Sequence, residues 1–186
     1  MKIIFIRHGK TPGNLKKQYI GITDESLTEQ GIYELKCRNY PDCDIVVSSP
    51  MKRCIETAKI VYPSKKIIIN QGLRECNFGN FECKSYEELK SNSDYIKWIE
   101  SGGVISFPNG ESRNAFSKRC TEAFASSIKG LNRDITVSFI IHGGTIMAIL
   151  EKYAFPKKSF YDFQVQGGGG FITDYNGMKI SILENL

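Results

Sequence analysis

The stretch IIFIRHGKT (residues 3–11) joins four apolar residues to a cation, an imidazole and a glycine. A short apolar run that ends at such residues is typical of a buried strand, so we expect residues 2–6 to form a strand inside a sheet. Arg7 and His8 would then stand at the carboxyl end of this strand. Pro and Gly residues break every helical or strand period through residue 26, which predicts a loop there.

Strand and helix patterns alternate along the rest of the chain. Apolar runs predict strands at 44–47, 67–69 and 135–141, and helical patterns occupy 27–39, 48–61, 112–131 and 145–153. Residues 164–183 are typical of two short strands around a glycine run and the turn at 176–177. The alternation predicts an α/β fold, a three-layer sandwich with a mostly parallel central sheet flanked by helices. No linker or repeat divides the chain, so we expect a single domain over residues 1–186.

Local signals predict where several helices begin. Thr28 is a candidate N-cap for the helix at 27–39, in which Leu35 and Cys37 would face inward. Pro50 would occupy an early position of the next helix, where its missing N–H has no partner to lose. Ser85 opens the sequence SYEE, a capping-box pattern that predicts a short helix.

The composition is that of a folded domain with a modest positive charge. Of the 186 residues, 41% are hydrophobic and 24% are charged, and the formal net charge is +5. Basic pairs at 16–17, 65–66 and 157–158 are dispersed among acidic residues, whereas nucleic-acid binding favours a dense basic stripe. We therefore expect a small anionic substrate and no nucleic-acid partner.

Cysteine and hydropathy patterns exclude further classes of protein. The six cysteines form no C-x-x-C pair and the chain has only two histidines, which argues against a zinc site and a disulfide scaffold. No run of about 18 apolar residues is present, and the first apolar run is too short for a signal peptide. We expect a cytoplasmic protein, monomeric or homodimeric, that has no membrane partner.

The unusual residues gather where strands are expected to end. Arg7 and His8 follow the first strand, the sequence SSPMKR (residues 48–53) follows the second, and His142 with two glycines follows the strand at 135–141. Ligands of such sheets bind outside the carboxyl ends of the strands. Arginine forks match phosphate oxygens, and a helix that begins at residue 144 or 145 would point free N–H groups at the same anion. The pattern therefore predicts an anion site.

Phosphate chemistry without a metal is the natural use of this site. The chain has no Walker-type loop and no cluster of carboxylates that would mark a magnesium site. We therefore expect neither a metal nor another cofactor. A leaving alkoxide still needs a proton donor, and Glu75, in the loop after the strand at 67–69, is the best candidate.

Five sequence blocks resemble, in order, those of the histidine phosphatase superfamily, which has the phosphoglycerate-mutase-like fold. RHGKT with Asn14 is similar to the signature R-H-G-x-T-x-x-N. The other blocks are SSPMKRC with Thr57-Ala58, LRECNFGNFE, PNGES and HGG, which begin at residues 48, 73, 108 and 142. The likeness extends along nearly the whole chain.

This resemblance implies a role for each site residue. His8 would be the nucleophile that becomes a phosphohistidine, and Glu75 would protonate the leaving group and later activate water. Arg7, Arg53 and His142 would complete the catalytic centre. The residues expected to bind the substrate are Arg7, Asn14, Gly21, Arg53, His142 and Gly143.

The branches of the superfamily differ around the general acid. The loop after Glu75 has the short form of the phosphatases, and bulky Ile20 stands where mutases usually carry a small polar residue. Hydrolysis of a small phosphomonoester is therefore favoured. The chain resembles the α-ribazole phosphatases among the short forms, which implies a role in cobalamin biosynthesis. The alternatives are a broad-specificity sugar or nucleotide phosphatase, a phosphoglycerate mutase, and a phosphate-binding protein without turnover.

Two further features bear on the choice of substrate. Phe81 and Cys83 replace a tryptophan and a glycine of the family pattern, and we expect both near the rim of the pocket. Residues 85–107 are a candidate cap segment that selects the leaving group, with Trp98 over the substrate. The alternative is that Trp98 and its helical neighbours Tyr95 and Ile99 form a small separate core.

Overall fold

A six-stranded sheet forms the centre of the structure, a computed structural model that describes residues 1–186. The strands lie in the order β3-β2-β4-β1-β5-β6. Strands β1 to β4 are parallel to one another, whereas β5 runs antiparallel to β1 and β6 antiparallel to β5. The bounds are Lys2–Arg7 (β1), Ile45–Ser48 (β2), Ile67–Ile69 (β3), Thr136–Ile141 (β4), Gly170–Tyr175 (β5) and Ile180–Asn185 (β6). The expected mostly parallel sheet is confirmed.

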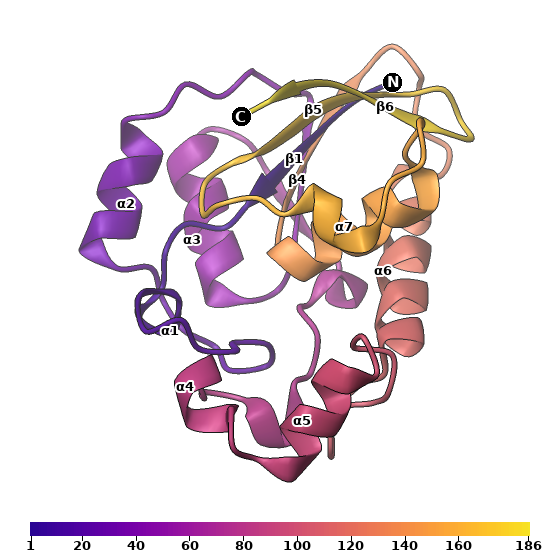
Figure 1. The fold of residues 1–186 in the computed structure, drawn as a ribbon. Coiled ribbons are helices and arrows are strands. Elements are labelled where there is room, and N and C mark those ends of the chain that lie inside the picture. The colour runs from indigo at the N-terminus through magenta and orange to yellow at the C-terminus, as the bar shows by residue number, and fades with distance from the viewer.

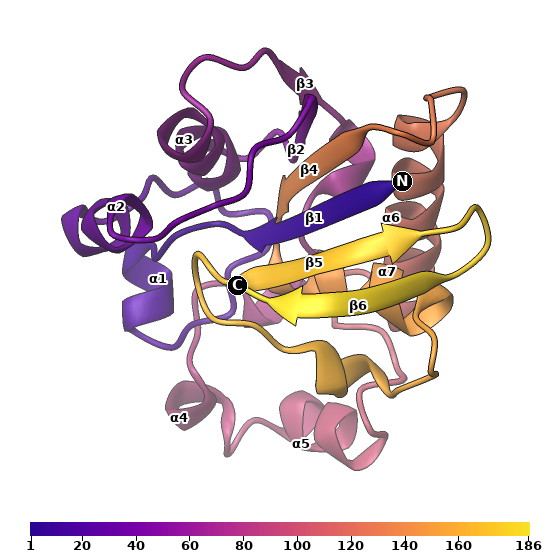
Figure 2. The same ribbon diagram turned by 90° about the horizontal axis from the view of Figure 1, so that it is seen from above.

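Helices cover both faces of the sheet, which confirms the three-layer arrangement (Figure 1, Figure 2). The α-helices are Pro12–Leu15 (α1), Glu29–Lys36 (α2), Lys52–Val61 (α3), Tyr86–Leu89 (α4), Ser93–Glu100 (α5), Arg113–Ile128 (α6) and Gly143–Tyr153 (α7). Three 3₁₀ helices lie at Gln71–Leu73 (η1), Gly79–Phe81 (η2) and Phe160–Phe163 (η3). Helices α4 and α5 lie together, away from the sheet (Figure 1). None of the helices combines the length and the apolar character that a membrane crossing requires.

The period of two along β1 sorts its side chains between two cores. Ile3 and Phe5 join a cluster with residues of α6 and α7, whereas Ile4 and Ile6 join a second cluster with residues of α3. All four side chains are fully buried. Both faces of β1 are therefore covered, and pairing with β4 and β5 places this strand in the interior of the sheet. This position fixes where the last residues of β1 leave the sheet.

Two of the features predicted at helix ends are confirmed, and two are wrong. Thr28 caps α2 by accepting the Gly31 N–H at 3.0 Å, and Ser85 forms the expected capping box with Glu88. The inward orientation predicted for Cys37 is wrong, because α2 ends at Lys36 and the Cys37 side chain is exposed.

The helical position predicted for Pro50 is also wrong. The Ser49 N–H still bonds the Ile140 carbonyl at 3.1 Å, so the backbone continues along β4 past the end of β2. Helix α3 consequently begins only at Lys52, with Met51 as its N-cap. The turn at residues 49–51 therefore belongs to the edge of the sheet where the site lies.

Candidate active site

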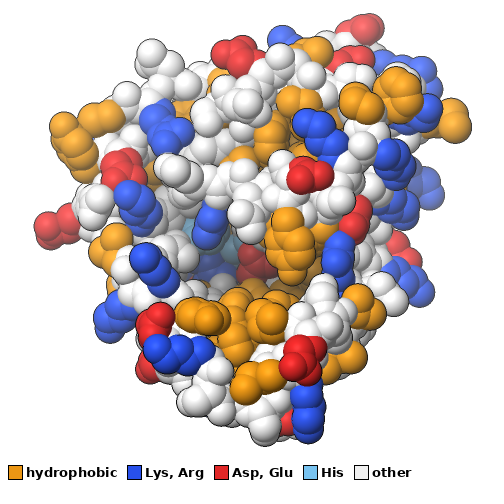
Figure 3. All heavy atoms as spheres, in the orientation of Figure 1, with side chains coloured by type: hydrophobic (Ala, Val, Ile, Leu, Met, Phe, Trp, Pro, Cys, Tyr) orange, Lys and Arg blue, Asp and Glu red, His pale blue; other side chains and the backbone are white.

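The ends of three parallel strands bring both histidines together. His8 follows β1, His142 follows β4, and their ring centroids lie 5.2 Å apart at an interplanar angle of 66°. Arg53, on the first turn of α3, completes the group after β2. Figure 3 shows a hollow on this face, with histidine and charged side chains at its floor and hydrophobic side chains on its rim. The convergence predicted from the sequence is confirmed.

The His8 ring is fixed in one tautomer. Its Nδ1 lies 2.7 Å from the Gly9 carbonyl oxygen, which can only accept, so Nδ1 carries the hydrogen and donates it. The other nitrogen, Nε2, then keeps an unshared electron pair. Burial lowers the pKa of His8 well below its usual range, and the positive charges of Arg53 and Arg7 lower it further. His8 is therefore a neutral ring with one nitrogen available for attack.

Arg53 is fully buried and held by backbone oxygens. Its Nη1 donates to the Thr23 carbonyl at 2.7 Å and its Nη2 to the Gly21 carbonyl at 2.8 Å. Gly21 has to be glycine here, because a Cβ at that position would lie 1.8 Å from the Cys76 carbonyl oxygen. The loop at 21–23 therefore fixes the guanidinium beside the histidines.

His142 is a neutral ring bonded at both nitrogens. Arg53 Nε lies 3.3 Å from Nδ1 and can only donate, so Nδ1 accepts and Nε2 carries the hydrogen. That Nε2 lies 2.7 Å from the Ser49 hydroxyl oxygen and donates to it. Burial, followed by the charge of Arg53, lowers the pKa of His142 well below its usual range. The contact predicted between His142 and a phosphate oxygen stays a prediction.

Arg7 presents an unused donor to the site. Its Nη1 donates to the Val165 carbonyl at 2.7 Å, but its buried Nε has no hydrogen-bond partner. This Nε faces α7, since it lies 3.4 Å from the position that a Cβ would take on Gly143. A buried donor without a partner costs free energy, which an anion oxygen at this point would recover. The pKa of Arg7 is lowered by burial, and the carboxylate of Glu75 opposes that shift.

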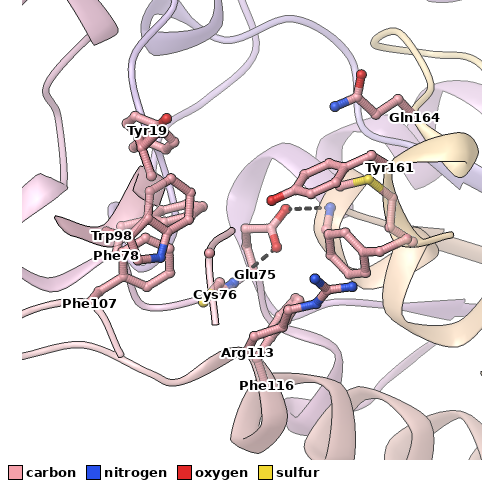
Figure 4. Close-up of a pocket in the computed structure, with 15 residues that line it drawn as sticks. Tyr19, Glu75, Cys76, Phe78, Trp98, Phe107, Arg113, Phe116, Tyr161 and Gln164 are labelled. Atoms are coloured by element: carbon pink, nitrogen blue, oxygen red, sulfur yellow. Dashed lines mark hydrogen bonds between the residues drawn. The ribbon is translucent and has the colours of Figure 1, made fainter. Parts of the chain in front are cut away.

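Glu75 is buried beside these cations and is bonded to two backbone amides (Figure 4). One oxygen accepts the Cys76 N–H at 3.0 Å and the other accepts the Gly144 N–H at 3.0 Å. The Gly144 N–H is therefore occupied by the glutamate. Helix α7 begins at Gly143, one residue before the earlier of the two predicted starts, and the contact of its other first-turn amides with an anion stays a prediction. Burial raises the pKa of Glu75, against the opposite effect of these hydrogen bonds and of Arg53 and Arg7.

Glu82 organises the loop that holds Arg53, a role that the sequence did not reveal. Its carboxylate accepts the N–H groups of Gly21 at 3.1 Å and Ile22 at 2.9 Å, and the Thr23 hydroxyl at 2.9 Å. The carbonyls of this same loop accept from Arg53. Glu82 is therefore a positioning residue. Its only signal in the sequence was its place in the block LRECNFGNFE.

A second carboxylate, Glu111, fixes the loop that carries Glu75. It pairs with Arg119 at 2.8 Å and accepts the Asn77 N–H at 2.9 Å. Arg119 in turn donates to the carbonyls of Gly72 and Arg74, both at 2.9 Å. The ion pair thus holds the chain on both sides of the general-acid candidate.

Other expected positions have different surroundings. The Asn14 amide oxygen accepts the Thr11 N–H at 3.2 Å inside a capping box, so its contact with phosphate stays a prediction, as does that of Gly143. The rim position predicted for Phe81 is wrong, because this ring is buried between Tyr95 and Phe107. Cys83 is exposed, and neither it nor Phe81 lines the large cavity beside Glu75.

That cavity has a volume of about 470 Å³. Trp98, Ile99 and Phe107 of the 85–107 segment line it. Tyr95 and Phe107 belong to the main core, and Trp98 packs against it, so the alternative of a small separate core is wrong. The cap function of the segment stays a prediction.

All six cysteines are unpaired. Cys54 is fully buried with its sulfur 3.5 Å from His142 Nε2, and burial raises the pKa of its thiol. Both facts agree with a packing role. No three His, Cys, Asp or Glu side chains come together as a metal-binding group would require.

Both histidines are expected to remain neutral at about pH 6, where an exposed histidine is largely protonated. The chain has only two histidines, so ¹⁵N-edited NMR of the untagged protein reports both rings directly. The urea-unfolded chain is the control, in which both rings should titrate near pH 6.5. A folded-state titration at that pH would contradict the burial argument.

Global stability is a poorer readout of the same groups. Histidines that stay neutral when folded make stability fall as the pH falls through the unfolded histidine pKa. A carboxyl group with a raised pKa, as in Glu75, makes stability fall as the pH rises. The two effects have opposite signs, so the ring signals have to be followed individually.

Comparison with known proteins agrees with this geometry. The family model of the histidine phosphatase superfamily (branch 1) matches residues 3–184. An adenosylcobalamin/alpha-ribazole phosphatase of Salmonella typhimurium is 26% identical over 177 residues, which cover 90% of this chain and 87% of the relative.

Solved structures share the fold over the full length. The alpha-ribazole phosphatase of Shigella flexneri has a TM-score of 0.84 at 25% identity, covering 98% of this chain and 95% of that one. A phosphoserine phosphatase mutant of Entamoeba histolytica, in complex with phosphoserine, has a TM-score of 0.83 at 27% identity, with coverages of 99% and 95%. The chain belongs to the histidine phosphatase superfamily, whose members are phosphatases or mutases.

Proposed function

We propose that this chain hydrolyses phosphomonoesters through a phosphohistidine formed on Nε2 of His8. The fixed His8 ring carries the proposal: Nδ1 donates to the Gly9 carbonyl, so Nε2 keeps its electron pair. A pKa held low by burial keeps that nitrogen unprotonated and nucleophilic. The guanidinium groups of Arg7 and Arg53 would balance the charge of the bound phosphate.

In the first step, the Nε2 electron pair attacks phosphorus and the bond from phosphorus to the ester oxygen breaks. The departing oxygen takes the proton of the Glu75 carboxyl group, whose pKa is raised by burial. The unpartnered Nε of Arg7 donates to a phosphoryl oxygen. The guanidinium groups of Arg7 and Arg53 are already in place, and they can stabilise the negative charge that is distributed over the phosphoryl oxygens in the transition state.

In the second step, water attacks the phosphohistidine. The Glu75 carboxylate takes a proton from the water as the new bond to phosphorus forms, and the electron pair of the breaking P–N bond returns to His8. Inorganic phosphate leaves with Glu75 protonated again. The amides of Cys76 and Gly144 hold the carboxylate in the same place for both steps.

We further propose α-ribazole 5′-phosphate as the substrate, within cobalamin biosynthesis. The Salmonella relative and the Shigella structure, both described as alpha-ribazole phosphatases, support this choice. A broad-specificity phosphatase is the second candidate, because a protein of that description from Saccharomyces cerevisiae is 29% identical over 194 residues, which cover 94% of this chain and 80% of the relative. Cytoplasmic location, a monomeric or homodimeric state and independence of metals stay predictions from the sequence.

Phosphate release from a substrate panel tests the function. The panel contains α-ribazole 5′-phosphate, ribose 5-phosphate, O-phosphoserine and 3-phosphoglycerate, each with and without EDTA. We expect α-ribazole 5′-phosphate to be preferred, EDTA to have no effect, and His8→Ala to lower turnover by roughly a thousandfold or more. Equal rates over the panel would agree with a phosphomonoester hydrolase but would refute α-ribazole 5′-phosphate as its specific substrate. Full activity in His8→Ala would refute the phosphohistidine.

Glu75→Gln is expected to separate two kinds of leaving group. Turnover of alkyl phosphates, which need a proton donor, should fall by about 10²–10⁴-fold. Formation of the phosphoenzyme from p-nitrophenyl phosphate should fall far less, because nitrophenolate leaves without a proton. Equal losses for both substrates, measured as the pre-steady-state burst, would contradict the role of general acid.

The pH profile follows from the same two groups. Attack needs neutral His8, whose lowered pKa moves the acidic limb below the ordinary histidine range. Departure needs protonated Glu75, so kcat/KM for alkyl phosphates should fall as the pH rises through the raised Glu75 pKa. A rate that climbs steadily through alkaline pH would contradict these assignments.

A further inference from the structure

The large cavity lies on the leaving-group side of the proposed reaction. Glu75 and Gly144 line it, whereas His8 does not. If Glu75 protonates the leaving oxygen, as the proposed function requires, the rest of the leaving group extends from that carboxyl group into the cavity. The walls of the cavity therefore determine which alcohol is released.

Two aromatic walls face each other across Glu75 (Figure 4). On one side the Trp98 indole packs on the Phe107 ring, with centroids 4.9 Å apart at 30°. On the other side Phe160 and Tyr161 of η3 form an edge-to-face pair with centroids 5.2 Å apart. A flat ring between such walls would gain aromatic contacts on both of its faces.

The walls approach each other at Gly103. A Cβ on this residue would lie 3.2 Å from the Trp98 indole and 3.3 Å from the Tyr161 hydroxyl oxygen. Gly103 has a φ of +75°, which suits a residue without a side chain. Trp98 and Tyr161 therefore both border the cavity next to Gly103.

The cavity offers a second ionic group one cation, Arg113, whose charge is already balanced by Glu151. Its only ionisable side chains with a formal charge are Glu75, already assigned to the reaction, and Arg113. Arg113 pairs with Glu151 at 2.6 Å, and its guanidinium carbon lies 4.5 Å from the centre of the Phe160 ring. An ammonium group on the leaving group would lose water without gaining a partner. A carboxylate or second phosphate would find only Arg113 and would compete there with Glu151.

We propose that the phosphomonoesters hydrolysed here carry an uncharged aromatic leaving group, whose ring inserts between Trp98 and Tyr161. The substrate class is then defined by one aromatic ring near the phosphate and by the absence of a second charge. A benzimidazole riboside fits this class, and so do simpler aryl-alkyl alcohols. Trp98 and Tyr161 are its specificity-determining residues.

The test compares three alkyl phosphates whose leaving oxygen needs a proton. The ammonium groups make the two charged alcohols the better leaving groups, so chemical reactivity does not produce a preference for the phenyl ester. We would measure kcat/KM for 2-phenylethyl phosphate, O-phosphoethanolamine and O-phosphoserine. The proposal predicts a preference of about tenfold or more for 2-phenylethyl phosphate. Equal values, or a preference for either charged substrate, would overturn it.

Variants of the cavity wall then test which residues cause the preference for the phenyl ester. Trp98→Ala and Tyr161→Ala are each expected to lower the ratio of phenylethyl to ethanolamine ester severalfold, mostly through KM, and Trp98→Phe should retain most of it. Tyr86→Ala is the matched control, because Tyr86 lies in the same 85–107 segment, is 57% exposed and does not line the cavity. An unchanged ratio in both Trp98→Ala and Tyr161→Ala would refute the assignment. Tyr161 is half exposed, so its variant tests the wall without removing core packing.

A binding measurement separates this inference from the proposed function. Calorimetry with 2-phenylethylphosphonate and 2-aminoethylphosphonate needs no turnover. If the protein hydrolyses none of the esters but binds the phenyl compound more tightly, the aromatic preference of the cavity is supported and the proposed hydrolase function is refuted. If the protein hydrolyses all esters without an aromatic preference, the hydrolase function is supported and the aromatic preference of the cavity is refuted.

Discussion

A buried permanent cation is the constraint around which the site is built. Arg53 has no exposed surface, and its two terminal nitrogens are held by the carbonyls of Gly21 and Thr23 rather than by a carboxylate. A charge in such a place is tolerated only when its hydrogens are satisfied. Those carbonyls are in turn placed by Glu82, which binds the N–H and hydroxyl groups of the same loop. The guanidinium therefore stands ready for an anion before any anion arrives.

The protonation states of the proposed catalytic groups follow from burial near these cations. His8 and His142 are kept neutral, and the hydrogen bond to Gly9 leaves the His8 electron pair on Nε2. Glu75 is driven toward its protonated form by burial although two guanidinium groups oppose it. A nucleophile without a proton and an acid with one are what phosphoryl transfer to a ring nitrogen needs.

The sequence predicted the centre of the site well because its residues directly follow strands. Apolar runs place His8 and His142 at the ends of β1 and β4, and the sheet then brings them together. The sequence-based predictions were wrong or incomplete where a residue far away in the chain determines the local structure. The Gly144 amide binds Glu75, 69 residues away, and the turn at Pro50 follows the pairing of Ser49 with β4. Glu82 acts on a loop some 60 residues earlier, which no local pattern could reveal.

Direct detection of the phosphoenzyme tests the central claim. Glu75→Gln should form the intermediate from p-nitrophenyl phosphate but hydrolyse it slowly, because no base activates the water. Rapid denaturation in alkali followed by mass spectrometry should then find one phosphoryl group on the peptide that contains His8, and its loss on acid treatment. Turnover without any such intermediate, or a phosphoryl group on His142, would contradict the mechanism.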